Sequence, residues 1–239
     1  MTRREPLNRE KVLDAALALA AEEGLKGLSM RKLAKTLGVE AMALYNHVRN
    51  KTDILDGIAE RVYSGIERAD PDSPWPERVR VTVLNTYRAL AAHPVVPMAL
   101  ATDEANPNSL QALLPLDDLV GALYEAGFDD DGIRPTLGAL NSLVFGSLLL
   151  TTVGFTKARK GEAEREQDER FLRRIDPAVL PNFSRAIPAL QAHDPEPDFM
   201  RALDLLISGL VAAAASGPGT AWPLRGPARR RRDRRPGSV

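Results

Sequence analysis

The chain has 239 residues, of which 44% are hydrophobic and 27% are charged, as in an ordinary soluble protein with a substantial core. It contains no cysteine, which excludes disulfides and thiolate metal sites. Its 32 basic and 32 acidic residues cancel but are unevenly placed. Residues 1–51 hold ten Lys or Arg against six Asp or Glu, residues 52–224 fifteen against twenty-five, and residues 225–239 seven against one. This pattern orients the basic N-terminal part toward a polyanion.

A first helix is expected to begin after Asn8, which can cap its N-terminus, and to end near Gly24. Asp14 interrupts the apolar run, so we interpret the segment as an amphipathic helix and not as a signal peptide. The apolar residues that recur at helical spacing are Leu13, Ala16, Leu17 and Ala20.

Residues 28–51 (LSMRKLAKTLGVEAMALYNHVRNK) predict two short helices joined by a tight turn, which is the layout of a helix-turn-helix. Ser29 can cap the first helix, and Gly38 tolerates a left-handed turn. On the second helix, of about eight residues by its spacing, Leu44 and Val48 lie one turn apart and face inward. Such a helix fits the major groove of DNA.

The opposite face of the second helix carries little charge and is surrounded by cations, which include Lys35 and Arg49. We expect its side chains to meet base edges while the cations neutralise phosphates. Asn46 can pair with adenine and Arg31 with guanine, and methyl-bearing side chains can contact thymine methyls. The candidate DNA-binding residues are Arg31, Lys32, Ala41, Met42, Ala43, Tyr45, Asn46, His47 and Lys51.

Helical periodicity continues along the chain and no stretch alternates with a period of two, so the predicted fold class is all-α. A connecting helix is expected over 50–68, and further helices over 76–92, from Asn106 or Asn108 to 126, and over 198–215. Residues 157–176 carry 13 charges, which predicts a flexible loop followed by one helical piece. The arginines after Gly226 predict a basic disordered tail that either attracts DNA or stays solvated.

Two uncharged segments, residues 135–156 and 205–224, are long enough to cross a membrane. Polar residues in the first and a Gly-Pro-Gly break in the second favour burial between helices, so no membrane partner is expected. Small residues at intervals of four allow another helix to approach closely, and the final helix offers an apolar surface. The residues of these two helix-packing surfaces are Gly138, Ser142, Gly146, Leu203, Leu206, Ile207 and Leu210.

The runs RKLA, LGV, LYNHVRNK and DILD make residues 8–62 resemble the DNA-binding part of TetR-type bacterial repressors. Residues 75–155, with WPERVRVTVLNTYRALAAHP and LYEAGF, resemble the ligand-binding part of the tetracycline-repressor branch. The resemblance implies that His47 contacts the DNA backbone and that a homodimer binds a near-palindromic operator in double-stranded DNA. It also implies that the two helix-packing surfaces given above are the dimerisation residues and form a four-helix seam, and a core wholly inside one subunit is the alternative.

The expected organisation is an N-terminal three-helix helix-turn-helix domain (1–51), a connecting helix (52–68), a larger helical effector-binding and dimerisation domain (69–217) and a basic tail (218–239). We call residues 1–51 the head and residues 69–217 the body.

In the tetracycline-repressor branch, a histidine and a glutamate help to hold a magnesium-bound drug. At the matching positions this chain has Ala99 and Leu150, which cannot ligate a hard divalent ion, so no metal or cofactor is expected. We expect instead a small, largely apolar effector enclosed by the body. Its candidate contacts are Thr82, Thr86, Thr102, Asn141 and Phe145, although polar residues at such positions can equally cap helices or bond between them.

The sequence lacks the Gly-x-Ser-x-Gly motif, a phosphate-binding Gly-rich loop that ends in Lys, and His-Glu-x-x-His, so an enzyme is not expected. The favoured interpretation is a cytoplasmic, ligand-responsive repressor that an effector releases by moving the connecting helix. The alternative is a helical small-molecule-binding or membrane-associated protein without specific DNA recognition.

Overall fold

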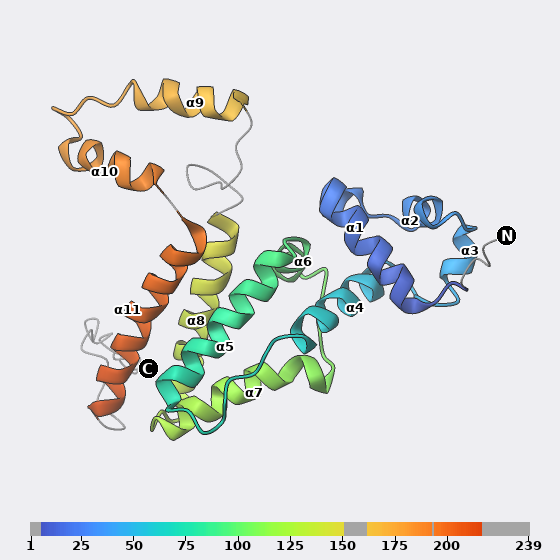
Figure 1. Cartoon of the computed structure of the whole chain (residues 1–239), viewed down its shortest axis with the longest axis horizontal. Helices are drawn as coiled ribbons and strands as arrows, with labels where there is room; N and C mark the ends of the chain where they lie inside the picture. The colour runs from blue at the N-terminus through green and yellow to red at the C-terminus, as the bar shows by residue number, and fades with distance from the viewer. Residues whose placement is uncertain (1–5, 151–161, 193, 217–239) are drawn as a thin grey trace, which may run out of the picture.

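The computed structural model describes residues 6–150, 162–192 and 194–216, and every element within these ranges is a helix, as predicted. The head contains α1 (Arg9–Gly27), α2 (Met30–Leu37) and α3 (Ala41–Leu44), and α4 (Lys51–Ser64) connects it to the body (Figure 1). The body contains α5 (Trp75–Ala92), α6 (Val95–Ala101), α7 (Leu110–Glu125), α8 (Asp130–Leu150), α9 (Glu162–Leu172), α10 (Pro181–Gln191) and α11 (Pro195–Ala215). The predicted tail and residues 157–161 lie outside the described residues.

Side-chain caps fix the starts of the helices in the head. Asn8 accepts a hydrogen bond from the backbone N–H of Lys11 (2.9 Å), and Ser29 accepts one from that of Lys32 (3.3 Å). Both predicted caps are confirmed. The expected end of α1 near Gly24 is a kink, because Gly24 has φ 73° and one further helical turn follows it to Gly27. Only glycine adopts this backbone conformation without strain.

Several boundaries differ from the prediction. The connecting helix ends at Ser64 and not near residue 68, because the chain leaves the helix at Gly65, whose N–H still bonds to the Arg61 carbonyl (3.1 Å). The next long helix of the body, α7, begins after Ser109, which caps it by accepting from the N–H of Ala112, and neither Asn106 nor Asn108 does so.

The short helix α6 lies between two of the predicted helices, in a stretch for which no helix was expected. Pro94 precedes it and Pro97 lies within it, and seven residues are too few to show a helical period. Its position matters, because α6 packs on both α1 and α4 and so places the body against the head.

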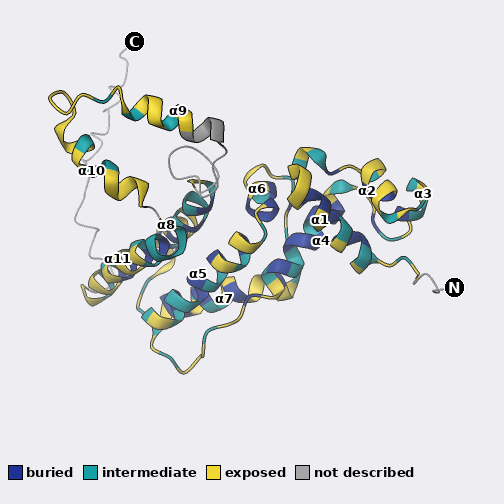
Figure 2. Cartoon of the chain, turned by 45° about the horizontal axis from the view of Figure 1, so that its top comes forward, coloured by how far each residue is buried: buried dark blue, intermediate teal, exposed yellow. Residues whose placement is uncertain are grey.

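One apolar core runs through the head, the connecting helix and the body. Figure 2 shows its buried residues on the facing sides of α1, α4, α5 and α7, while α9 and α10 are mostly exposed. In the body, the rings of Tyr87 and Phe199 stack with their centroids 3.9 Å apart, which ties α5 to α11. Complete burial of a side chain such as Phe199 stabilises the fold by about 1.5–3 kcal/mol.

The structure corrects the expected role of the last helix. Leu203, Ile207 and Leu210 are buried inside the subunit, where α11 packs against α5 and α8, and Leu206 is half-buried. They therefore do not form a free dimerisation surface. The helical spacing of apolar residues shows that one face of α11 is covered, but not whether the cover comes from the same subunit.

One face of α8 stays open. Gly138 and Ser142 are exposed, Gly146 is half-buried, and a methyl group added at either glycine would meet no atom within 4 Å. By length and composition α8 could cross a membrane, and only 22% of its most apolar 18-residue stretch is buried by the rest of the chain. On neighbouring α11, Leu205 is 76% exposed and Val211 is exposed as well. Within the described chain, these apolar surfaces have no cover.

The helical piece predicted within residues 157–176 is present as α9, and ion pairs one turn apart stabilise it, including Arg170 with Glu166 (2.6 Å). Among the apolar residues of this segment, Leu172 and Ile175 are half-buried and Phe171 is 46% exposed. The following helix α10 was not predicted and has no buried residue.

Candidate nucleic-acid interface and effector cavity

The turn between α2 and α3 has the geometry that the sequence predicted. Gly38 ends α2 in the left-handed conformation (φ 64°, ψ 39°). The N–H of Val39 then donates to the carbonyl of Ala34 (3.0 Å), which closes the turn. This reversal directs α3 away from α2, as in a helix-turn-helix.

The second helix of this motif is shorter than the expected eight residues. α3 spans only Ala41–Leu44, its N-terminal neighbour Glu40 makes no capping hydrogen bond, and the chain continues as a turn through His47. The His47 N–H donates three residues back to Leu44 (2.9 Å), which is the tighter pattern of a helix end. Leu44 and Val48 are buried as predicted, so the inward face is correct although the helix is short.

A carboxylate network holds this turn in place. Asp53 of α4 accepts hydrogen bonds from the Arg9 guanidinium (2.9 and 3.2 Å) and from the backbone N–H of Arg49 (2.7 Å). The same guanidinium donates to the His47 carbonyl (3.2 Å). Asn50 caps α4 by accepting from the Asp53 N–H (2.8 Å). The residues after α3 are thus fixed to both α1 and α4.

The hydrogen bonds from Arg9 lower the pKa of Asp53 to about 2, helped by the Arg49 backbone N–H and opposed by desolvation. Sequence reasoning missed this network, because Arg9 and Asp53 are 44 positions apart. Its only local signal was the Asn50 cap, three residues before Asp53.

The outward face around α3 is largely uncharged, as predicted. Met42 is 74% exposed, Tyr45 and Asn46 are also exposed, and Ala41, Ala43 and His47 are half-buried. Arg31 and Lys35 on α2 are exposed, as is Arg49, the residue just before α4. This surface is defined here as the reading face. The structure therefore brings apolar and amide side chains together between cations.

Two predicted phosphate contacts are engaged elsewhere in this conformation. Lys32 forms an ion pair with Glu23 of α1. Lys51 donates to the carbonyl of Leu25 (2.9 Å) and pairs with Glu104 of the body (3.1 Å), which lowers the pKa of that carboxyl. Lys51 is thus a link between head and body and does not belong to the reading face.

The five residues expected to contact an effector lie on α5, at the end of α6 and on α8. Thr82 is buried in α5, and Thr86 donates its hydroxyl to the Thr82 carbonyl (2.8 Å), which is a bond within the helix. Asn141 is exposed on the same helix as Ser142, and Phe145 is half-buried against the core. Because Asn141 lies on the exposed side of α8, its expected role as an effector contact inside the body is corrected.

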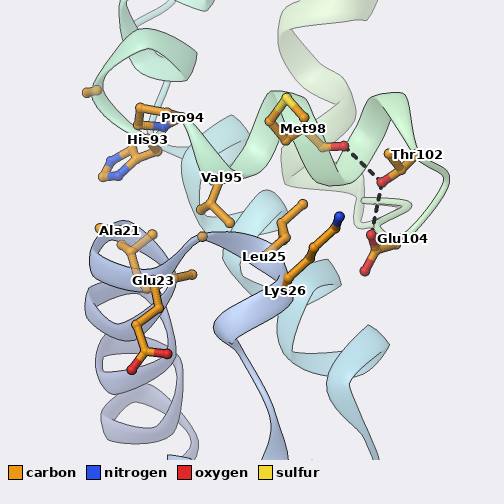
Figure 3. A pocket seen from close by; sticks show the side chains of 14 residues that line it. Ala21, Glu23, Leu25, Lys26, His93, Pro94, Val95, Met98, Thr102 and Glu104 are labelled. Carbon is orange, nitrogen blue, oxygen red and sulfur yellow. Dashed lines mark hydrogen bonds between the residues drawn. The ribbon is translucent and has the colours of Figure 1, made fainter. Parts of the chain in front are cut away.

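A cavity lies between the end of α1 and α6, and Thr102 is the one candidate effector contact that lines it. The cavity has a volume of about 560 Å³, and its walls are mostly apolar (Figure 3). The head contributes residues of the end of α1, and the body contributes α6 with its flanks. The lining residues are Leu17, Ala20, Ala21, Glu23, Gly24, Leu25, Lys26, Ala92, His93, Pro94, Val95, Met98, Thr102 and Glu104. About seventy positions separate the two walls, so sequence spacing gave no signal of it.

Among the residues that the structure describes, no cluster of three or more His, Cys, Asp or Glu side chains could hold a metal ion. Ala99 is buried in α6 and Leu150 is exposed at the end of α8.

Two parts of the chain match known protein families. Residues 12–58 match the family described as bacterial regulatory proteins, tetR family, and residues 68–214 match the tetracyclin repressor-like C-terminal domain. An HTH-type transcriptional regulator from Saccharopolyspora erythraea is 30% identical over 211 residues, which cover 87% of this chain and 86% of that protein. The class D tetracycline repressor from Escherichia coli is 28% identical, with 85% of this chain and 88% of the repressor covered.

Solved structures agree. A possible TetR family transcriptional regulator from Streptomyces coelicolor A3(2) has a TM-score of 0.71 at 30% identity and covers 86% of this chain and all of that one. Apo ActR from Streptomyces coelicolor has the same TM-score at 24% identity, covering 90% and 99% of the two chains, and shares the fold. The helix-turn-helix geometry and both matched domains lead to one assignment. This chain belongs to the TetR family of bacterial transcriptional regulators.

Proposed function

We propose that this regulator is a cytoplasmic homodimeric repressor, which binds a near-palindromic operator and is released from it by a small, largely apolar effector. The observation that carries the proposal is the reading face, an exposed and nearly uncharged surface around α3 with exposed cations beside it. A solvated helix face normally carries charge, whereas a face that enters the major groove needs groups that match base edges.

The side chains of the reading face divide into two roles. Asn46 can bond to adenine, Arg31 to guanine, and Met42 can contact thymine methyl groups. Lys35 and Arg49 can neutralise phosphates at the sides of the groove, together with His47, without reading sequence. Because Lys32 and Lys51 are already paired within the subunit, they are secondary candidates for the phosphate role.

A dimer follows from the small size of the reading face. One four-residue helix and its following turn reach only a few base pairs, so specific binding needs two copies on two half-sites. We propose that the open faces of α8 and α11 meet their symmetry mates, with Gly138 and Ser142 allowing close approach and Leu205 supplying apolar contact. This arrangement also covers the apolar length of α8 without a membrane.

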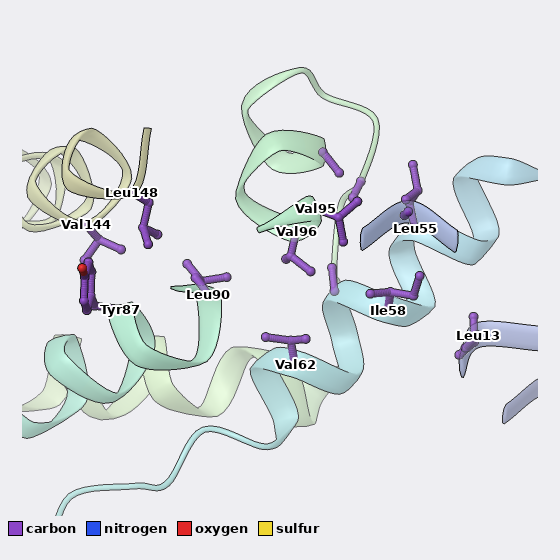
Figure 4. Packing of buried hydrophobic residues seen from close by; sticks show 14 of the residues in the cluster. Leu13, Leu55, Ile58, Val62, Tyr87, Leu90, Val95, Val96, Val144 and Leu148 are labelled. Carbon is purple, nitrogen blue, oxygen red and sulfur yellow. The ribbon is translucent and has the colours of Figure 1, made fainter. Parts of the chain in front are cut away.

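Effector and operator binding can be coupled because packing is continuous from head to body. Figure 4 shows this continuity, with α4 in the middle of the packed side chains. The side chains include Leu13 of α1, Ile58 and Val62 of α4, Leu90 and Tyr87 of α5, and Val144 of α8. A displacement of α4 by an effector would change the separation of the two heads, and a coupling of about 1–3 kcal/mol would weaken operator binding about 5- to 150-fold.

Two observations on relatives support an effector of this kind. ActR has been solved in complex with actinorhodin, and other relatives are named as tetracycline repressors. In this chain Ala99 and Leu150 stand at the positions aligned with metal-binding side chains, which favours an effector that needs no magnesium. Thr82, Thr86 and Phe145 remain its proposed contacts in the body, whereas Thr102 lines the cavity between α1 and α6.

Selection of bound fragments from random duplex DNA tests the proposal. We expect one inverted repeat to be enriched, a particle of two subunits in solution, and relaxed base preference at one position per half-site in Arg31→Ala. Lys35→Ala is the matched control, because it should weaken binding to all sequences and lower the salt dependence by about one counterion. No enriched repeat, or a strictly monomeric particle, would contradict the proposal and favour a small-molecule-binding protein without specific DNA recognition.

A further inference from the structure

The cavity between α1 and α6 lies where the head meets the body, outside the helices that would enclose an effector in the body. Gly24 opens it, because the positive φ of this residue bends the last turn of α1 away from the rest of the helix. Val95 and Met98 form the wall on α6, and Leu17 and Ala21 form the wall on α1. A volume of about 560 Å³ is within the range of sites that enclose a drug-sized molecule.

The charges at this cavity do not cancel. Of the charged side chains that line it, Glu23 pairs with Lys32 and Glu104 pairs with Lys51. Lys26 has no ion-pair or hydrogen-bond partner for its ammonium group within the described part of the chain. In Figure 3 its side chain extends toward α6, whereas Glu23 points away from α6. The cavity therefore presents one uncompensated positive charge beside apolar walls.

We propose that this cavity binds a small molecule with an apolar body and one anionic group, such as an aromatic carboxylate or sulfonate, which Lys26 holds by a charge-assisted hydrogen bond. The apolar body of the ligand packs between Val95, Met98 and the end of α1, and the uncharged side chain of Thr102 lies beside the ligand. The Thr102 hydroxyl already donates to the Met98 carbonyl (2.9 Å), so it serves as a wall and an acceptor.

Such a ligand would contact head and body at the same time. The bound ligand would favour the orientation of the head in which the cavity between α1 and α6 is open. If the head has a different orientation on the operator, the ligand would change the operator affinity, by an amount set by its difference in affinity for the two orientations. This regulatory consequence rests on the proposed function, but binding itself does not. The site is separate from the proposed effector contacts on α5 and α8, so one regulator could respond to two compounds.

A fluorescence titration of the full chain with 8-anilinonaphthalene-1-sulfonate tests the site, because this probe is aromatic, anionic and emissive when desolvated. We expect saturable binding that weakens about tenfold in Lys26→Met, which removes the charge and keeps the apolar stem. Ala21→Trp should abolish this binding by filling the cavity from an exposed position. Lys35→Met is the matched control, since it removes an exposed head lysine outside the cavity and should leave the affinity unchanged.

Circular dichroism of each variant establishes that it is folded before its titration is compared. Equal affinity in the parent and Lys26→Met, or equal weakening in Lys26→Met and Lys35→Met, would overturn the proposed site. The result is independent of the DNA selection above. Weaker probe binding in Lys26→Met without any enriched operator would support the cavity and reject the proposed function. Unchanged probe binding in Lys26→Met together with an enriched inverted repeat would reject the cavity and support the proposed function.

Discussion

Replacement of Asp53 by Asn tests whether the carboxylate network supports the head. A pKa of about 2 in place of the ordinary 3.8 corresponds to about 2.4 kcal/mol of folding free energy at neutral pH. Solvent screens the pair because the Arg9 side chain is 41% exposed, and we therefore expect a loss of about 1 to 2 kcal/mol in the variant. Urea unfolding at pH 7 measures this loss.

The pH dependence of the loss separates ionisation from other effects of the substitution. Folding lowers the pKa of Asp53, so its contribution is complete above about pH 5 and disappears as the pH falls toward 2. The difference in unfolding free energy between parent and Asp53→Asn should fall to about half at pH 3. The same difference at pH 3 and pH 7 would refute the reasoning.

Asp14→Asn is the matched control, because Asp14 also pairs with an arginine, Arg61 of α4, at 2.8 Å. Its side chain is 66% exposed, so we expect a change of no more than about 0.5 kcal/mol. A loss in Asp14→Asn as large as that in Asp53→Asn would show that the position of the network at the turn has no special importance.

Three further predictions concern a turn, the link between head and body, and the core. Gly38→Ala should lower the melting temperature, because alanine in the left-handed conformation costs about 1–2 kcal/mol. Gly121→Ala should raise the melting temperature, because Gly121 lies within α7 and has free space around it. A change of melting temperature in the same direction for both variants would contradict this reasoning. Lys51→Met and Glu104→Gln should each loosen the link between head and body, and a double-mutant cycle on unfolding should give a non-zero interaction energy, because the two side chains pair directly. Phe199→Ala should cost about 3–5 kcal/mol in urea unfolding, since the ring stacks on Tyr87 inside the core, and a smaller loss than about 1 kcal/mol would contradict the packing.

Local chemistry explains what the sequence predicted well. The caps Asn8 and Ser29, the left-handed Gly38 and the inward pair Leu44 and Val48 all depend on neighbours within about five positions, as helical rules do. The C-terminal end of the last helix, at residue 215, and the existence of one covered face were also evident from spacing, whereas its start lies three residues before the predicted one.

Contacts between distant segments explain what the sequence could not predict. Periodicity identified one apolar face on α11, but only the structure shows that Leu203 is buried and that α11 packs against α5 and α8 of the same chain. Lys51 was placed among the phosphate contacts because a cation near a helix-turn-helix favours that role, whereas its partners, Leu25 and Glu104, come from two other segments. The cavity was missed for the same reason, since its walls belong to α1 and α6.

The continuous core has a consequence for protein engineering. The helix α4 packs on α1 of the head and on α5, α6 and α7 of the body, and this packing buries Leu55, Ile58 and Val62. A fusion cut after Lys51 would therefore expose apolar surface on each half. A chimera made at that point should express poorly and aggregate. To redirect this regulator to a different promoter, one should graft new side chains onto α2 and α3, or transplant the head together with all of α4.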